Sequence, residues 1–401
     1  MSKINDLIKK LCPNGVEYKK LREIGDTFTG LSGKSKNDFV DGNARFITYT
    51  NIYNNPAVRL DLDDMVIIKE NDNQNELKYG DILVAGSSEN LEDSGMISVV
   101  CEEPKENIYL NSFCFGFRLN DEYKDKLIPG FSKHIFRSAS FRNQIVSCSF
   151  GVTRYNLNKK MFLDLTVPIP PLEVQEEIVR ILDKFGELEA ELEAELEARK
   201  SQYEFWHGQL FNKAGNTKIA DVFRRLKGTS ITAGTMKEIE DPEGDIRIFA
   251  GGQTAVNARV ESINKPNIID VPCVIVQSRG LIDFIYYDKP CTFKNEMWAY
   301  TCDNQITVKY LYYYLKNNVQ YFRTIGSQMG SMPQISLPVT EKYNIYLPSL
   351  DEQKRIVNIL DKFDTLVNDI TSGIPAEIEL RRQQYEYYRN KLLNFEELKA
   401  N

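Results

Sequence analysis

The residues that could do catalytic chemistry in this chain are few and lack the neighbours that such chemistry needs. The stretch LSGKS at Leu31–Ser35 resembles a phosphate-binding loop, but that pattern requires a glycine where Phe28 stands. The two histidines, His134 and His207, occur in no metal-binding or triad-like motif. The sequence also has no DPPY or NPPY tetrapeptide, which amino-methyltransferases carry. We therefore predict a chain that is not an enzyme and binds no metal or cofactor itself.

Polar loops instead supply the side chains that proteins use to read DNA. Arginine pairs with guanine and amides pair with adenine, while lysine contacts phosphate. The alternative is that these residues are ordinary turn formers, but their recurrence in both halves of the chain favours DNA. The predicted contacts in the first half are Ser32, Lys34, Lys36, Tyr49, Asn51, Tyr53, Ser87, Ser88, Thr153, Arg154 and Asn156. Those in the second half are Lys227, Thr229, Ser230, Gln253, Asn257, Gln277, Arg279, Gln328 and Ser331.

These loops recur because the chain contains an internal repeat. The segment Pro170–Leu188 returns 178 residues later as Pro348–Leu366, and 11 of the 19 positions are identical. A fainter similarity aligns Ile24–Ser35 with Ile219–Ser230, residue for residue. The sequence therefore predicts two copies of one plan, and a molecule of this kind suits a two-part target such as bipartite DNA.

The first copy of the repeat opens a long predicted helix. Apolar residues follow one another at steps of three and four from Ile178 onward. The tetrapeptide ELEA then occurs three times over Glu187–Ala198, and its residues are strong helix formers. We expect one helix over Glu173–Phe211. Its narrow apolar stripe needs one partner helix rather than a full core.

The second copy predicts a helix that is interrupted. The sequence Thr371–Pro375 contains Gly373 and Pro375, which predict a break and a new helical segment with the proline in its first turn. That segment carries Arg381–Leu393, which matches Arg199–Phe211 at an offset of 182 instead of 178. The copies thus differ by one four-residue unit.

The regions between the helices contain short β-branched runs and many loops. Expected strands include 82–84, 97–100, 113–119 and 274–276. We predict a first domain over 1–167, a helical region over 168–214, a second domain over 215–345 and a second helical region over 346–401.

Composition limits the class of protein further. No run of 18 apolar residues predicts a membrane span, and the first residues do not read as a signal peptide. Seven cysteines without a CxxC pair fit a reducing cytoplasm. The net charge of −7 is concentrated in residues 173–197, which carry −8, so the remainder is close to neutral and does not exclude DNA.

Together these segments resemble the DNA-specificity subunit of type I restriction–modification systems. The resemblance is carried by FTGLSGKSKNDF, FITYTNIYNN and GDILVAGSS, by IVQSRG, KNEMWAY and SMPQISL, and by both helical repeats. It implies an α+β architecture in which two loop-rich α/β target-recognition domains are separated by two long antiparallel helices, with pseudo-two-fold internal symmetry. Each domain would read one half of a split site in double-stranded DNA.

The resemblance also implies partners. These are two methyltransferase subunits, which bind S-adenosylmethionine, and restriction subunits, which translocate DNA with ATP and Mg. We predict that the helices dock the methyltransferases, or alternatively that their aromatic residues pack the two helices together. The predicted partner-binding residues are Arg199, Lys200, Tyr203, Trp206, Arg381, Arg382, Tyr385 and Tyr388.

Two other functions stay open at this point. A fused restriction–modification enzyme is opposed by the missing methyltransferase tetrapeptide. A coiled-coil adaptor that binds only protein is opposed by the size of the loop-rich domains.

Overall fold

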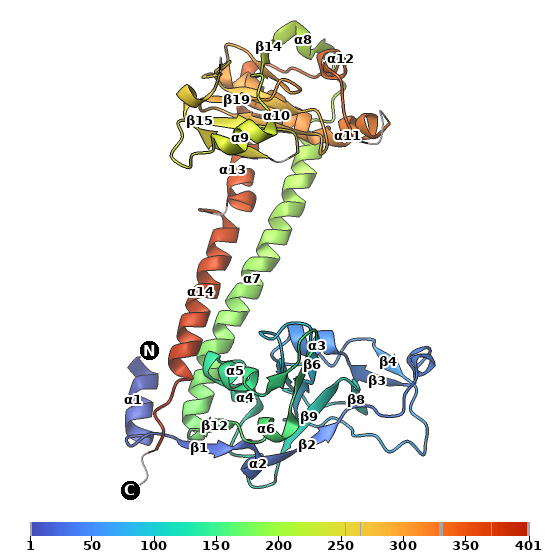
Figure 1. Cartoon of the computed structure of the whole chain (residues 1–401), viewed down its shortest axis with the longest axis vertical. Coiled ribbons are helices and arrows are strands. Elements are labelled where there is room, and N and C mark those ends of the chain that lie inside the picture. Colours follow the sequence, from blue (N-terminus) through green and yellow to red (C-terminus); the bar gives the residue numbers. More distant parts are fainter. Residues whose placement is uncertain (1, 253, 265, 329–331, 370, 399–401) are drawn as a thin grey trace. The chain divides into compact units, whose positions relative to one another are not determined.

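The structure is a computed structural model that describes residues 2–252, 254–264, 266–328, 332–369 and 371–398. It divides into two compact units (Figure 1). Unit 1 comprises Met1–Glu191 and Ile378–Asn401, and unit 2 comprises Leu192–Glu377. Unit 1 therefore contains both ends of the chain. Among the described residues, no helix has both the length and the apolar character needed to cross a membrane.

Unit 1 is built on a four-stranded antiparallel sheet with the strand order β2-β9-β5-β7. A second sheet has the order β4-β3-β8, in which β3 and β8 are parallel, and a third has the order β10-β11-β6. The strands are β1 (Glu17–Lys20), β2 (Gly25–Thr29), β3 (Ala44–Ile47), β4 (Met65–Val66), β5 (Ile82–Ala85), β6 (Ser87–Ser88), β7 (Ile97–Val99), β8 (Ile108–Leu110), β9 (Cys114–Leu119), β10 (Ser149–Phe150), β11 (Tyr155–Leu157) and β12 (Thr166–Ile169).

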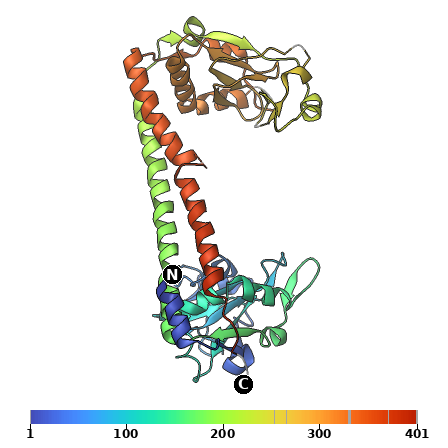
Figure 2. The ribbon, with the colours of Figure 1, turned by 90° about the vertical axis from the view of Figure 1, so that its left-hand side faces the viewer.

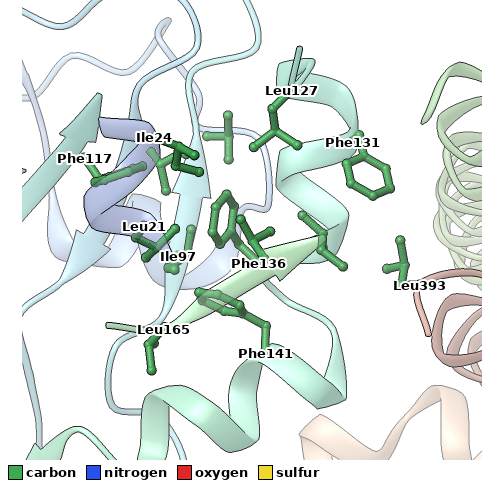
Figure 3. Close-up of a cluster of buried hydrophobic side chains, with 14 of the residues drawn as sticks. Leu21, Ile24, Ile97, Phe117, Leu127, Phe131, Phe136, Phe141, Leu165 and Leu393 are labelled. Carbon is green, nitrogen blue, oxygen red and sulfur yellow. The ribbon is translucent and has the colours of Figure 1, made fainter. Parts of the chain in front are cut away.

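Short helices pack around the sheets of unit 1 and contribute to its hydrophobic clusters. They are α1 (Ser2–Leu11), α2 (Leu21–Ile24), α3 (Tyr49–Asn54), α4 (Pro129–Ile135), α5 (Ala139–Val146) and α6 (Lys159–Phe162), with a 3-10 turn η1 at Lys36–Phe39. Figure 3 shows Phe136 and Phe141 turned toward the side of the sheet residues Ile97 and Phe117, whereas Phe131 lies on the far side of its helix. All five are buried, and burial of side chains this large contributes about 1.5–3 kcal/mol each.

Unit 2 repeats this topology. Its main sheet has the order β14-β20-β17-β18, its second sheet the order β16-β15-β19 with one parallel pair, and β13 pairs with β21 as β1 does with β12. The strands are β13 (Thr217–Lys218), β14 (Arg224–Lys227), β15 (Ile246–Phe249), β16 (Ala255–Ala258), β17 (Cys273–Gln277), β18 (Asp283–Tyr287), β19 (Cys291–Phe293), β20 (Trp298–Thr301) and β21 (Asn344–Ile345). The helices are α8 (Ile219–Val222), α9 (Ala233–Glu238), α10 (Gln305–Asn317), α11 (Val319–Ser327) and α12 (Leu337–Glu341), with a 3-10 turn η2 at Val260–Ser262.

The strand pairing corrects the predicted alignment of the two domain starts. Leu110 and Phe293 end equivalent strands, since they pair with Ile47 and Phe249 in the parallel pairs of the two units. The residue after Gly30 donates its N–H to Leu110 O, and the residue after Gly228 donates to Phe293 O, both at 2.7 Å, so these two glycines occupy the same place. The true offset is therefore 198, whereas the aligned letters had placed Gly33 opposite Gly228. Neighbouring side chains happened to match three residues out of register.

The helical predictions are confirmed. The long helix α7 runs from Leu172 to Leu210, so it is 39 residues long. The second helix ends at Asn368 as α13 (Leu350–Asn368), and α14 (Ile374–Leu392) begins with Pro375 in its first turn. The division between the units falls in α7 at Glu191/Leu192, inside the ELEA repeat.

Within unit 1, α14 runs antiparallel to the first part of α7 (Figures 1 and 2). Phe185 stacks on Tyr388 with ring centroids 5.4 Å apart. One turn further along α7, Glu189 Oε1 accepts a hydrogen bond from Arg382 Nε at 2.6 Å. Below these contacts, Leu393 completes the core of unit 1 (Figure 3). The C-terminal segment of the chain is thus a structural part of its N-terminal domain.

Repeated residues of the two helices perform the same structural task in each unit. Gln175 is fully buried and donates to Pro170 O at 2.7 Å, and its counterpart Gln353 donates to Pro348 O at 2.8 Å. Asp183 accepts from His134 at 2.7 Å. Its counterpart Asp361 accepts from Lys309 at 2.8 Å and from the Tyr313 hydroxyl at 2.5 Å. The buried amides also bond to Lys126 O in unit 1 and to the Thr307 hydroxyl in unit 2, so together with the half-buried carboxylates they attach each helix to the domain of its own unit.

Candidate nucleic-acid interface

In unit 1, strand register brings the ends of three strands to one edge. Leu31 N donates to Leu110 O, so the chain leaves β2 beside the end of β8. Asn111 N donates to Ile47 O, which places the end of β3 there as well. Gly86 N donates to Phe113 O at the end of β5. The loops that follow β2, β3 and β5 therefore surround residues 111–113.

The predicted contact residues of unit 1 lie in these loops and in the β10–β11 hairpin. Ser32, Lys36, Thr153, Arg154 and Asn156 are exposed. Tyr49 and Tyr53 in α3 are half-buried and stack with ring centroids 6.1 Å apart. A hydrogen bond to the Asp93 carboxylate is the main cause that raises the pKa of Tyr53.

Hydrogen bonds connect these groups across the edge. Asn90 lies between them, since its side chain donates to Asp93 and its N–H donates to Ser88 Oγ. Ser88 pairs in turn with Tyr155 in β11. Tyr53 is thereby connected to the hairpin through Asp93, Asn90 and Ser88. The set forms a polar surface that could hydrogen-bond to base edges and phosphates.

The turn of this hairpin requires a glycine. Gly151 has φ of +154°, and a Cβ there would lie 1.9 Å from Arg154 O, so only glycine fits the turn. Arg154 Nε donates to Ser87 Oγ at 3.3 Å, and its guanidinium lies 5.6 Å from the ring centre of Phe113. The exposed guanidinium is therefore oriented but not paired with a carboxylate in any described contact.

Two arginines from the α4–α5 region bond to the backbone of the loops that follow β3 and β6. Arg137 donates to the backbone oxygens of Ile52, Tyr53, Asn55 and Ile97 at 2.5–3.1 Å. Burial lowers the pKa of Arg137 to about 10, which still leaves it charged at neutral pH. Through these bonds α3 is attached directly to the core of unit 1.

Arg142 performs the same task for the loop after β6. It donates to the backbone oxygens of Glu92, Ser94 and Gly95 at 2.6–2.9 Å. Because Arg137 and Arg142 bond to the backbone of both loops, the polar groups of these loops are preorganised for binding.

Several predicted contacts of unit 1 are instead structural. The Lys34 side chain is only 5% exposed, and its ammonium donates to Ile67 O and pairs with Asp72, so it is not available to a phosphate. Asn51 is buried, and its side-chain amide donates to Arg59 O and accepts from Arg59 N. Ser87 and Ser88 are also buried and act through Arg154 and Asn90.

Unit 2 forms the equivalent edge from the equivalent strands. Lys294 N donates to Phe249 O as Asn111 does to Ile47 O in unit 1. Arg279 forms a β-bridge with Gln334, whose side-chain oxygen also accepts from the guanidinium at 3.3 Å. The loops after β14, β15 and β17 and the segment around Gln334 thus lie together.

The predicted residues of unit 2 divide in the same way. Arg279, Lys227, Ser230 and Gln328 are exposed. Two predicted residues are buried in the fold: Thr229 lies against Thr292, and Gln277 donates to Gly252 O. Asn257 is half-buried and accepts from Arg247 in the neighbouring strand, so its contact with DNA stays a prediction. Gln253 and Ser331 lie outside the described residues.

Sequence reasoning missed the apolar part of the edge in unit 1. Phe113 is 63% exposed although it stands in a predicted strand, and Phe150 is 56% exposed in a loop from which only polar residues were chosen. Gln334, the partner of Arg279, was not singled out either. The turn residues Asn111 and Gly151 were the available signals that these positions belong to loops.

The helices carry the predicted partner-binding residues in two different environments. Tyr203 packs on Phe363 at 6.1 Å in unit 2, and Tyr385 on Phe185 at 6.5 Å in unit 1, so these tyrosines join helices as the alternative interpretation expected. Tyr388 also stacks on Phe185. Trp206 stays 43% exposed beside Phe205. The basic residues bond to neighbouring side chains: Arg199 to Glu195, Lys200 to Glu197, Arg381 to Gln384 and Arg382 to Glu189.

The described residues contain no cluster of histidine, cysteine or acidic side chains that could hold a metal ion. The seven cysteines are free thiols.

The two histidines make the stability of the chain sensitive to acid. Burial is the main cause that lowers the pKa of both His134 and His207 below 6.5. At His134 the Asp183 carboxylate raises the pKa, while the positive charges of Lys133 and Arg389 lower it further. The unfolded chain therefore binds protons that the folded chain resists. Stability should be fully present above pH 6.5 and fall below it, by at most about 1.4 kcal/mol per pH unit for each histidine.

Denaturant unfolding at pH 7.0, 6.0 and 5.0 would measure this dependence. His134→Gln and His207→Gln should each flatten the slope between pH 6.5 and 5.0, whatever they do to stability at pH 7. Slopes identical to that of the unchanged chain would show that the histidines are not responsible.

Comparison with known proteins identifies the family. The model of the type I restriction modification DNA specificity domain matches the chain twice, over residues 13–198 and 214–380. The chain therefore belongs to the type I restriction–modification specificity family, as the sequence motifs predicted.

Individual relatives agree with this assignment. The chain is 34% identical over 256 residues to the specificity subunit of a type I restriction enzyme of Escherichia coli. That match covers 57% of this chain and 63% of the relative, which is less than two thirds of its length. A Haemophilus influenzae chain named as a type I restriction enzyme specificity subunit is 30% identical over 292 residues, covering 68% of this chain and 74% of that one.

Solved structures share the fold. The type I system S subunit from M. genitalium aligns with a TM-score of 0.55 at 15% identity, over 94% of this chain and 96% of that chain. The HsdS subunit from Thermoanaerobacter tengcongensis aligns with a TM-score of 0.52 at 17% identity, over 96% and 97%. The expected fold class, with repeated mixed α/β domains and long helices, is thus confirmed.

Proposed function

We propose that this chain reads DNA sequence for a type I restriction–modification complex and that each unit reads one half of a bipartite site. The observation that carries the proposal is the repeated edge. In both units the loops after equivalent strands meet at one place, and an exposed arginine stands there, Arg154 in unit 1 and Arg279 in unit 2. Equivalent surfaces with different side chains suit two half-sites of different sequence.

The surrounding residues support direct reading of bases. Arginine can pair with O6 and N7 of guanine, and Asn156 can pair with adenine. Exposed lysines such as Lys36 and Lys227 suit phosphate contacts, which set affinity rather than sequence choice.

We further propose that the helices dock two copies of one methyltransferase subunit. Phe205 and Tyr387 are equivalent at the offset of 182 and are 60% and 59% exposed. Two equivalent exposed aromatic residues on helix surfaces fit two copies of the same partner. S-adenosylmethionine would belong to those subunits, and ATP and Mg to the restriction subunits that complete the complex.

In this proposal the chain has no catalytic activity of its own. Purified full-length chain, incubated with duplex DNA and labelled S-adenosylmethionine, should transfer no methyl groups and should leave the DNA uncut in the presence of ATP and Mg. Adding the methyltransferase encoded with it should produce methylation at defined sites. Stoichiometric methyl transfer by the chain alone would overturn the proposal and favour a fused enzyme.

A further inference from the structure

The β10–β11 hairpin of unit 1 presents apolar side chains to solvent at the proposed DNA-reading edge. Val152 at its turn is 90% exposed, Phe150 is 56% exposed, and nearby Phe113 is 63% exposed. None of the three belongs to a buried cluster of the described residues. The fold therefore gains little from these side chains, although exposing them to water is unfavourable.

Strand register and one ring contact connect two of these side chains to the polar residues of the edge. Phe150 lies opposite Asn156, and Asn156 lies opposite Ser87 in the next strand, so Phe150, Asn156 and Ser87 share a face of the small sheet. Ser87 accepts from Arg154, whose guanidinium covers the ring of Phe113. We name Phe113, Phe150 and Val152 together the apolar patch. Phe113 borders Arg154, Phe150 borders Asn156, and Val152 lies in the turn two residues before Arg154.

The shape and composition of this surface match the major groove. That groove admits a two-stranded β-ribbon, and β10 and β11 form an antiparallel hairpin at the edge of a three-stranded sheet. Arginine and asparagine there pair with guanine and adenine, and the one apolar group that the groove presents is the C5 methyl of thymine, which phenylalanine and small apolar groups contact. A purely phosphate-binding hairpin would carry basic residues where Phe150 and Val152 stand.

We infer that the apolar patch contacts the 5-methyl group of a thymine next to the base that Arg154 reads. The inference rests on the proposed function, because it requires unit 1 to bind duplex DNA through this edge. It adds a specificity determinant: Phe113, Phe150 and Val152 would select thymine by its methyl group, a feature that hydrogen-bonding side chains cannot sense.

The test replaces thymine by deoxyuridine, which removes only the methyl group. The full chain with its methyltransferase first selects bound duplexes from a random pool, which defines the half-sites. The selected duplex is then synthesised with deoxyuridine at one thymine at a time. We expect one position, within one half-site, at which deoxyuridine weakens binding about 4-fold, the effect of one buried methyl group.

Variants link that position to the hairpin. Val152→Ala and Phe150→Ala should bind the thymine duplex more weakly and bring its affinity close to that of the deoxyuridine duplex. Both residues are exposed, so the fold should survive, and circular dichroism checks this. Tyr79→Ala is the matched control, since Tyr79 is 52% exposed but lies before β5, at the opposite end of that strand. It should keep the full discrimination.

The outcomes separate the two proposals. If no sequence is selected from the pool, the proposed function itself fails. If half-sites are selected but no thymine responds to deoxyuridine, or if Val152→Ala and Phe150→Ala keep the discrimination, unit 1 reads DNA without the apolar patch and this inference is overturned.

Discussion

Replacing Arg137 with alanine should destabilise unit 1 by about 3 kcal/mol and abolish reading of its half-site. Arg137 is partly buried, and its guanidinium bonds to four backbone oxygens, three of them at the end of α3 and in the turn that follows it. Removing it leaves buried acceptors without donors, and each such group costs about 1–3 kcal/mol before relaxation. Because α3 carries Tyr49 and Tyr53, the loss reaches the proposed DNA-reading edge directly.

Denaturant unfolding and DNA binding together measure this effect. Arg137→Lys should give an intermediate loss, because one ammonium cannot reach all four oxygens. The control is Arg59→Ala in the same unit. Arg59 forms an ion pair with Asp61, and because both side chains are exposed, the pair should contribute less than about 1 kcal/mol to stability. If Arg137→Ala and Arg59→Ala were equally stable, the anchoring role of Arg137 would be wrong.

Deleting the four residues Glu191–Ala194 should change the spacing between the two half-sites. α7 continues from unit 1 into unit 2, and the deletion removes one ELEA repeat at the division between them. Four residues correspond to about 6 Å of helix and about 40° of rotation beyond a full turn. Since base pairs in B-DNA are about 3.4 Å apart, we expect the unspecified spacer to shorten by one or two base pairs.

The deletion should leave folding and both half-sites intact. Leu192 is half-buried and the other three residues are exposed, and the pair between Glu189 and Arg382 lies outside the deleted segment. Glu191→Gln alters the same segment without changing its length, so it is the control and should keep the original spacer. If the deletion kept full activity with an unchanged spacer, the repeat would be only a solvated helix surface, and altered half-sites would equally contradict its role in spacing.

The periodic parts of the fold could be predicted from the sequence. Apolar residues at helical steps gave α7 and the two pieces of the second helix, because side chains three and four residues apart face one partner. Short apolar runs gave strands such as β5 and β17. The repeat also predicted that both units share one plan, which their sheets confirm.

The role of single loop residues could not be predicted, because it depends on distant partners. Lys34 is neutralised by Asp72, which lies 38 residues away, and Thr229 is buried against Thr292, 63 residues away. Conversely, Phe113 seemed to belong to a strand, but β9 begins one residue later and leaves it outside the core. Residue type and loop location correctly indicated which edge of each unit carries the polar loops. Burial then decided which side chains at that edge remain available for contact with DNA.

Mapping adenine methylation across the genome of a host that carries this chain and its methyltransferase tests the central proposal most directly. The account predicts one bipartite motif, with Arg154→Ala relaxing a position in one half and Arg279→Ala relaxing a position in the other, because each arginine stands at the reading edge of its own unit. A motif that either variant changes in both halves, or that persists when the chain is deleted, would contradict the account.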